Sequence, residues 1–104
     1  MNKLIVFLAV ILLTQTSYAQ NIEVCNTCPT SSLKDAIIQA KDFDTITVKK
    51  GTYKEYDVLV NKPLTIIGEN YPVIDGESKG EIITVVSDNV TVDGLFIINV
   101  GNSY

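Results

Sequence analysis

The sequence predicts an all-β fold: the N-terminal coils of a right-handed parallel β-helix, preceded by a short amphipathic cap helix. From residue 45 onward the chain consists of short runs rich in β-branched residues, separated by turn residues, and helical periodicity does not return. The same region is similar to itself, because "VLVNKPLTIIG" (58–68) aligns with "TVVSDNVTVDG" (84–94). Self-similarity at such a period is typical of a solenoid.

The repeat predicts which residues stack on one another in successive coils. The offset of 26 residues places Leu64 over Val90, Ile66 over Val92 and Gly68 over Gly94; before them, Leu59 falls on Val85 and Val60 on Val86. Further along, "VIDG" (73–76) resembles "IINVG" (97–101) at an offset near 24. Each unit holds three short strands and three turns. We therefore expect each strand to pair with its equivalent one coil later, with alternate apolar side chains facing inward.

The first element is an export leader, residues 1–19. Lys3 precedes an apolar run over 4–13, and the small-residue pattern Ser17-Tyr18-Ala19 follows. This arrangement is that of a secretory signal peptide cleaved after Ala19. The apolar run is about half of the roughly 20 residues that a membrane-spanning helix needs. We expect a periplasmic protein with no transmembrane segment in the mature chain.

Composition excludes several classes of function. The formal net charge is −4, and loss of the leader removes Lys3 but no acidic residue. Nothing basic is available to hold nucleic acid, so no nucleic-acid partner is expected. The chain has no Arg and no His, and its one Met is Met1. What remains after the leader is one small domain.

The segment 20–31 contains both cysteines, in the stretch "VCNTCP". As thiolates, Cys25 and Cys28 could hold Cu(I) in a two-coordinate site. As a redox pair they gain support from Cys28 lying just before a helix start. In an oxidising compartment they could instead form a disulfide that ties the N-terminal strand to the cap helix. The spacing leaves all three open, but a zinc centre lacks further ligands.

The segment 32–44 contains the cap helix. An apolar stripe at helical spacing is formed by Leu33, Ala36, Ile37 and Ala40, and we expect Ile38 and Phe43 to widen it. Ser31 or Ser32 can cap the helix, and Ser32 with Asp35 approximates a capping box. We expect the helix to shield the open N-terminal end of the coils.

Residues 45–104 then form the first coils. The sequence stops directly after a strand, at "NVGNSY", with about three coils present. A solenoid needs about three repeats together with its capping units. We therefore expect these residues to be the N-terminal piece of a longer β-helix.

Two groups of charged residues have alternative interpretations. Asp75-Gly76 and Asp93-Gly94 could line up carboxylates on successive coils, as in polysaccharide-cleaving β-helices that bind calcium, but Asp-Gly is also ordinary turn chemistry. Lys49, Lys50, Lys54 and Lys62 could meet an anionic partner, or could belong to a mixed-charge surface. We favour the turn and the mixed surface.

The chain also carries motifs of a known family. They are "AKDFDTITVKKGTYKE" (40–55), "KPLTIIG" (62–68), "VIDG" (73–76) and "NVTVDGL" (89–95). With the cysteines before the helix, this combination resembles the N-terminal part of the NosD family, Bacteroidetes type. The resemblance implies a non-enzymatic periplasmic protein that assists copper-site assembly in nitrous oxide reductase together with an ABC transporter.

The alternative is a protein that acts on sugars. The pattern "DTI…GTY…LTI" also begins many β-helix proteins that bind or cleave carbohydrates, whose catalytic coils would lie downstream. A lyase needs a base and a cation near the substrate carboxylate, and without Arg or His only lysine remains for either role. We therefore expect no enzymatic activity from this chain.

Overall fold

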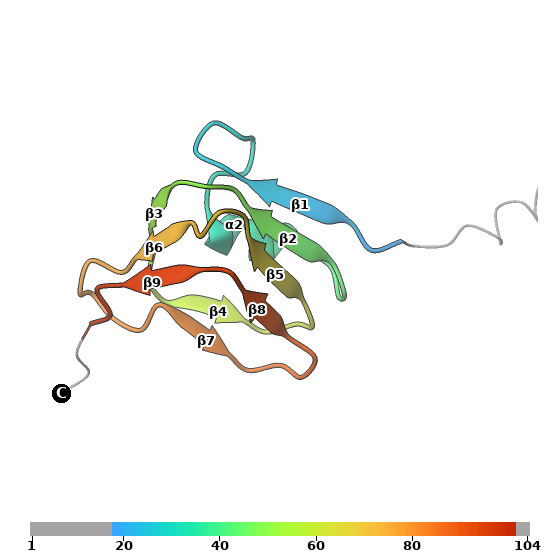
Figure 1. Ribbon diagram of the computed structural model, residues 1–104. Coiled ribbons are helices and arrows are strands. Elements are labelled where there is room, and N and C mark those ends of the chain that lie inside the picture. The colour runs from blue at the N-terminus through green and yellow to red at the C-terminus, as the bar shows by residue number, and fades with distance from the viewer. Residues whose placement is uncertain (1–17, 102–104) are drawn as a thin grey trace, which may run out of the picture.

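The computed structural model describes residues 18–101, which form a parallel β-helix of about three coils with one short helix (Figure 1). Most of the predicted leader, residues 1–17, lies outside the described residues. The strands are β1 Asn21–Val24, β2 Thr45–Val48, β3 Thr52–Lys54, β4 Val58–Val60, β5 Thr65–Gly68, β6 Val73–Asp75, β7 Ile83–Val85, β8 Thr91–Asp93 and β9 Phe96–Ile98. The helix, α2, spans Leu33–Gln39. Over the described part, no helix has the length and apolar character needed to cross a membrane.

The strands stack into three parallel sheets, ordered β1-β2-β5-β8, β3-β6-β9 and β4-β7. Each sheet runs along the axis of the solenoid, since its neighbouring strands come from successive coils (Figure 1). β1 extends the first sheet by one strand before the helix, with Val24 opposite Val48. This arrangement confirms the predicted parallel β-helix.

The predicted stacking is correct in one sheet and shifted in the other two. Ile66 of β5 pairs with Val92 of β8, as the offset of 26 required. In β4 and β7, however, Val60 pairs with Val85 rather than Val86, because the connection over 86–90 is one residue longer than that over 61–64. In the third sheet Val73 pairs with Phe96, an offset of 23 residues where the sequence predicted one near 24. This offset is smaller than the 26 between β5 and β8 in the first sheet because the corner that precedes β9 is shorter than the one that precedes β6.

Inward-facing side chains form continuous apolar rows through the coils. In one row Ile46 and Ile66 are fully buried, and Val92 at the C-terminal end is 39% exposed. In another, Tyr53 and Ile74 are buried and Ile97 is 42% exposed. Burial of each large apolar side chain stabilises the fold by about 1.5–3 kcal/mol. The core therefore lies in the N-terminal and middle coils.

The helix packs against β1, β2 and β4 and covers the N-terminal end of the solenoid. Its predicted stripe is correct, since Leu33, Ala36, Ile37 and Ala40 are all buried. The widening by Ile38 and Phe43 is wrong: these side chains are 72% and 66% exposed. Ile38 lies beside the buried stripe and lines an open groove next to β4, and Phe43 follows the helix in a turn with a positive φ of 69°.

Capping at the start of the helix comes from two sources. Ser32 is the N-cap, and its Oγ accepts from the Asp35 N–H at 3.0 Å, as the capping-box pattern suggested. The carboxylate of Glu55, which follows β3, accepts from the N–H groups of Leu33 at 2.7 Å and Lys34 at 2.9 Å. These bonds satisfy N–H groups that a helix start leaves without intrahelical partners. The first coil and the cap helix are thereby joined by directed bonds as well as by apolar packing.

Candidate metal and redox site

The two cysteines lie in the loop that connects β1 to α2. β1 ends at the fully buried Val24, and Cys25 follows it directly. The loop is folded back on itself, because the Cys25 N–H donates to the Thr30 carbonyl at 3.3 Å and the Cys28 N–H donates to the Cys25 carbonyl at 3.1 Å. A buried strand end and a closed turn thus place both side chains at the capped end of the solenoid.

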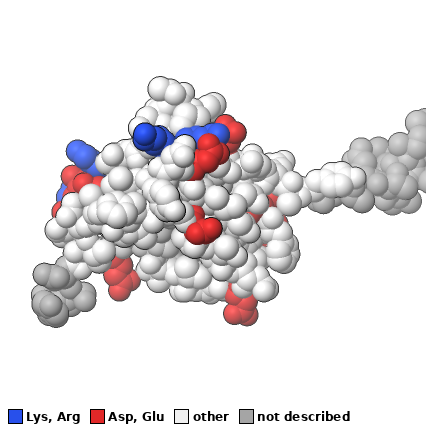
Figure 2. All heavy atoms as spheres, viewed as in Figure 1, with Lys and Arg blue, Asp and Glu red and all other residues white. Residues whose placement is uncertain are grey.

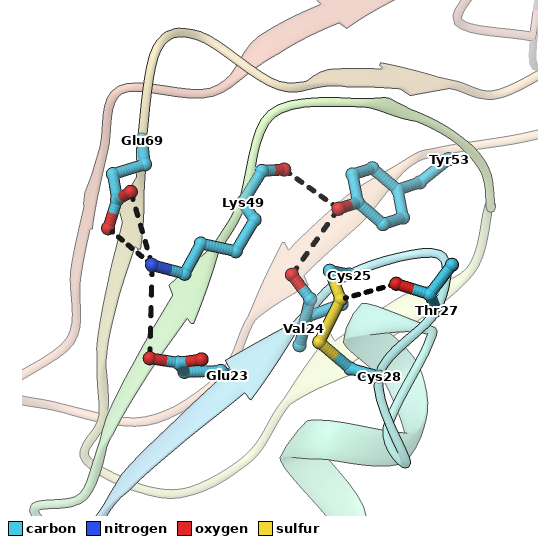
Figure 3. The surroundings of a disulfide bond; sticks show 8 residues. All are labelled: Glu23, Val24, Cys25, Thr27, Cys28, Lys49, Tyr53 and Glu69. Carbon is cyan, nitrogen blue, oxygen red and sulfur yellow. Dashed lines mark hydrogen bonds and ion pairs between the residues drawn. A yellow bond between two sulfur atoms is a disulfide. The ribbon is translucent and has the colours of Figure 1, made fainter.

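The structure joins the two sulfur atoms in a disulfide, 1.98 Å apart (Figure 3). Both residues are partly exposed, and the Cys25 sulfur lies 3.6 Å from the Thr27 hydroxyl. The disulfide closes the turn itself and does not reach the helix. Contact with the helix is made instead by Thr30, whose hydroxyl exchanges hydrogen bonds with the Gln39 amide at 3.1 and 3.3 Å.

A disulfide has no thiolate, so this pair can hold Cu(I) only after reduction. The four-residue turn keeps the two sulfur atoms together, which suits a two-coordinate Cu(I) site. Among residues 18–101 no three or more His, Cys, Asp or Glu side chains are grouped so as to hold a metal ion. Copper binding by the reduced cysteines stays a prediction.

A row of charges runs beside the loop across three strands (Figure 3). The Lys49 ammonium lies 3.1 Å from a Glu69 carboxylate oxygen and 3.8 Å from one of Glu23. The hydrogen bond to Glu69, together with the charge of Glu23, raises the pKa of Lys49. These groups are partly exposed, so the row contributes little to stability. It presents both signs of charge next to the disulfide.

Beneath the loop, the Tyr53 hydroxyl lies between backbone carbonyls at the ends of β1 and β2. It donates to the carbonyl of Lys49 at 2.7 Å, and it lies 3.3 Å from that of Val24 (Figure 3). Its burial, and the charge of Glu55, raise the pKa of Tyr53. The ring is buried in the middle of β3, not at a coil corner, and is unavailable for stacking on a ligand.

The two Asp-Gly pairs do not form a carboxylate row. Asp75 is in β6 and pairs with Ile98, whereas Asp93 is in β8 and pairs with Ile67 in a different sheet. Asp75 Oδ1 accepts from the Asn99 amide and from the Glu77 N–H, each at 2.9 Å. These two bonds lower the pKa of Asp75. Asp75 therefore orders its own turn, and the alternative of aligned carboxylates is wrong.

The four lysines singled out above do not act as one patch. Lys49 is engaged with acidic groups, and Lys62 donates to the Ala40 carbonyl at the end of the helix at 2.6 Å. On the face drawn in Figure 2, lysine and acidic side chains lie next to one another. Mixed charge describes this surface better than a basic site does.

A groove of about 440 Å³ lies between the helix and β4. It is lined by Lys34, Ile37, Ile38, Asp57, Leu59, Asn61 and Lys62. Its lining is apolar at Ile38 and Leu59, which are exposed, and at the buried Ile37, and the other lining residues are charged or polar.

Sequence reasoning missed two carboxylates near the capped end. Glu55 binds the helix start, and Asp44, which is 1% exposed, accepts from the N–H groups of Gln20 at 2.7 Å and Lys41 at 2.8 Å. Both belong to the motif "DTITVKKGTYKE" (44–55), whose acidic ends were the available signal.

No family model, no curated protein and no solved structure matches this chain.

Proposed function

We propose that this chain is an exported, non-enzymatic accessory protein for copper-site assembly in nitrous oxide reductase, working with an ABC transporter. The observation that carries the proposal is the position of Cys25 and Cys28: a partly exposed pair in one turn, at the capped end of a parallel β-helix. The family motifs over 40–95 support the same assignment. Export through the leader would deliver the pair to the compartment where such a reductase receives copper.

In this proposal an exported dithiol reductant reduces the Cys25–Cys28 disulfide by thiol–disulfide exchange, and the two thiols of the reductant become a disulfide in turn. The dithiol binds Cu(I) through two thiolates, and the disulfide does not bind it. Two soft ligands without a third leave the ion accessible to a thiol or imidazole ligand of an acceptor. Such a site suits transfer of the metal better than permanent storage.

Copper titration of the reduced chain tests the metal site. Residues 20–104 are titrated anaerobically with Cu(I) against a chromogenic Cu(I) chelator. The reduced protein should take a single Cu(I) from the chelator, and neither the oxidised protein nor the Cys25→Ser/Cys28→Ser variant should compete. Glu69→Gln is the matched control, because it alters the neighbouring charge row and leaves both sulfur atoms in place. Equal binding by the double-serine variant would end the copper role of this loop.

The biological role needs a cellular test. In a denitrifying host, deletion of the gene should leave nitrous oxide reductase exported but deficient in copper. Reintroduction of the wild-type gene should restore the copper content, and the double-serine gene should not. A fully metallated reductase in the deletion strain would contradict the proposal.

The second candidate is a carbohydrate-binding protein, favoured by the aromatic side chain of Tyr71, which is 74% exposed. Exposed aromatic rings provide stacking faces for sugars. Retention on immobilised acidic and neutral polysaccharides, compared between wild type and Tyr71→Ala, separates this candidate from the first. Retention that depends on Tyr71, in a chain that does not bind Cu(I), would favour it.

A further inference from the structure

Both backbone groups of Gln20, its N–H and its carbonyl, are hydrogen-bonded. Its backbone N–H donates to Asp44 Oδ1 at 2.7 Å, and its carbonyl accepts from the Thr45 N–H at 2.9 Å. It immediately precedes β1, and the two residues before it, Tyr18 and Ala19, are exposed and in no regular element. The nitrogen of Gln20 therefore has a fixed position against a carboxylate, while the peptide bond that precedes it is accessible.

The Asp44 carboxylate that accepts from the Gln20 N–H is a buried anion. Its side chain is almost completely buried, and its second oxygen accepts from the Lys41 N–H at 2.8 Å. Hydrogen bonds from Gln20 and Lys41 hold the pKa of Asp44 below its ordinary value, and the nearby charges of Lys41 and Lys62 act in the same direction. The carboxylate is thus ionised at neutral pH. A buried anion is best satisfied by a cation that can donate hydrogen bonds.

We infer that Asp44 is the binding site for the α-ammonium group that removal of the leader after Ala19 creates on Gln20. The inference rests on the leader cleavage that the proposed function includes. Cleavage replaces the peptide nitrogen by an ammonium nitrogen at the same place, so the contact changes from a neutral to a charge-assisted hydrogen bond. The Thr45–Gln20 bond keeps β1 in register while the new terminus forms.

The pair has a chemical consequence for Gln20. An N-terminal glutamine cyclises when its neutral amine attacks the side-chain amide carbon; a C–N bond forms, the bond to the amide nitrogen breaks and ammonia leaves. An ammonium group has no lone pair for this attack. By keeping the amine protonated and oriented toward the coil, Asp44 protects Gln20 from conversion to pyroglutamate.

The first experiment measures the pKa of the α-amino group by NMR. Residues 20–104 are released from a fusion by a protease that leaves Gln20 first, and the control chain begins at Ala19 and retains Asp44. An amine bound to Asp44 should titrate above its ordinary value of about 8, since an opposite charge favours the protonated form. The charges of Lys41 and Lys62 near Asp44 oppose this shift, and we expect the direct contact between the Gln20 nitrogen and Asp44 at 2.7 Å to outweigh them. A terminal amine that titrates alike in both chains would overturn the inference.

The sign of the pH dependence gives a second readout. A raised pKa means that the stabilisation is fully present below the unfolded value, near 8, and is lost as pH rises through the folded value. The chain that begins at Gln20 should therefore lose stability in mildly alkaline solution relative to the chain that begins at Ala19. Parallel stability profiles for the two chains would contradict the pair.

The third readout is the rate of cyclisation, which mass spectrometry detects as the loss of ammonia. The folded wild-type chain should cyclise about tenfold more slowly than the Asp44→Asn chain or than wild type in urea. Equal rates in folded and unfolded wild type would refute protection even if the Asn variant does not fold. The N-terminal residue of the exported protein is read separately in cells. A different terminus there would refute the leader cleavage and leave the measurements on the released chain valid.

Discussion

Gly68 and Gly94 occupy the same corner of successive coils, with the backbone of one packed against the backbone of the other. A Cβ atom on Gly94 would lie 2.6 Å from the Gly68 carbonyl oxygen, and Gly94 has a positive φ of 79°. A Cβ atom on Gly68 would clash with the Gly94 carbonyl and lie 2.8 Å from Cδ of Pro72. Neither corner has room for a side chain, which is a reason for glycine where the backbone must approach closely.

Gly68→Ala should therefore destabilise the protein by about 2 kcal/mol, the usual scale for overpacking. Urea denaturation followed by circular dichroism measures the loss. Gly80→Ala is the control, because the nearest atom to a Cβ there is the Asp57 Oδ1 at 3.2 Å, at the end of a flexible side chain, and Tyr56 Cδ2 follows only at 3.9 Å. The control should change stability by less than about 1 kcal/mol. Equal losses for both variants would show that the coils do not stack as described.

Features that repeat with the coils could be predicted from the sequence. The Gly68 and Gly94 alignment, the inward row through Ile66 and Val92, and the buried stripe of the helix all follow from periodic patterns. Each pattern reflects a geometric period of the chain: alternation in a strand, a helical turn, or one coil of the solenoid.

Features that depend on a single distance between remote residues could not be predicted. Glu55 lies 22 residues from Leu33, and Asp44 lies 24 residues from Gln20. The acidic ends of the motif 44–55 mark the two carboxylates, but no periodic pattern indicates which backbone N–H groups they contact. The pairing of β4 with β7 differs from the predicted pairing by one residue because the corner after β7 is longer. The length of this corner changes which residues pair but does not change the hydrophobic pattern of the strands. For the cysteines, spacing allows a disulfide or a metal site, because redox state is set by the surroundings and not by the sequence alone.

Glu55→Gln should weaken the attachment of the cap helix. An amide keeps one acceptor oxygen, so one of the two bonds to Leu33 and Lys34 is lost together with the negative charge at the helix start. We expect a loss of about 1 kcal/mol in urea denaturation, as for other capping residues. The matched control is Glu69→Gln, whose ion pair with Lys49 is exposed to solvent and therefore contributes little to stability. A smaller loss for Glu55→Gln than for Glu69→Gln would contradict the capping role.

Neighbouring isoleucines of β5 offer a matched test of the core. Ile66 is fully buried, and Ile67 points outward with 39% exposure. Ile66→Val should cost about 1 kcal/mol, because it leaves a methyl-sized void in a row that continues into both adjacent coils. Ile67→Val makes the same chemical change and should lie within about 0.5 kcal/mol of wild type. A reversed order of the two losses would place the wrong face of β5 inside.

The disulfide should contribute modestly to stability. Its two cysteines are separated by only three positions, and closing so short a loop in the unfolded chain is worth about 2 kcal/mol by the chain-entropy argument. Cys25→Ser/Cys28→Ser, or reduction of wild type, should therefore lower the free energy of unfolding by this amount while leaving the β-sheet circular dichroism intact. Reductant added to the double-serine variant is the control and should have no effect. Complete unfolding on reduction would mean that the loop organises the whole capped end.

The contact between Asp75 and Asn99 should make stability depend on pH in acid. The hydrogen bonds from Asn99 and Glu77 lower the pKa of Asp75 in the folded state below its ordinary value of 3.8. The ionised carboxylate therefore stabilises the fold at any pH above 3.8, and this stabilisation is lost as the pH falls through the pKa of the folded state. Asp75→Asn should thus be less stable than wild type at pH 6, and the difference should narrow toward pH 3. Asn99→Ala removes the donor from the adjacent coil, so the double variant isolates the pair in a mutant cycle. A coupling energy that stays the same from pH 6 to pH 3 would show that the charge of Asp75 plays no part in holding these two coils together.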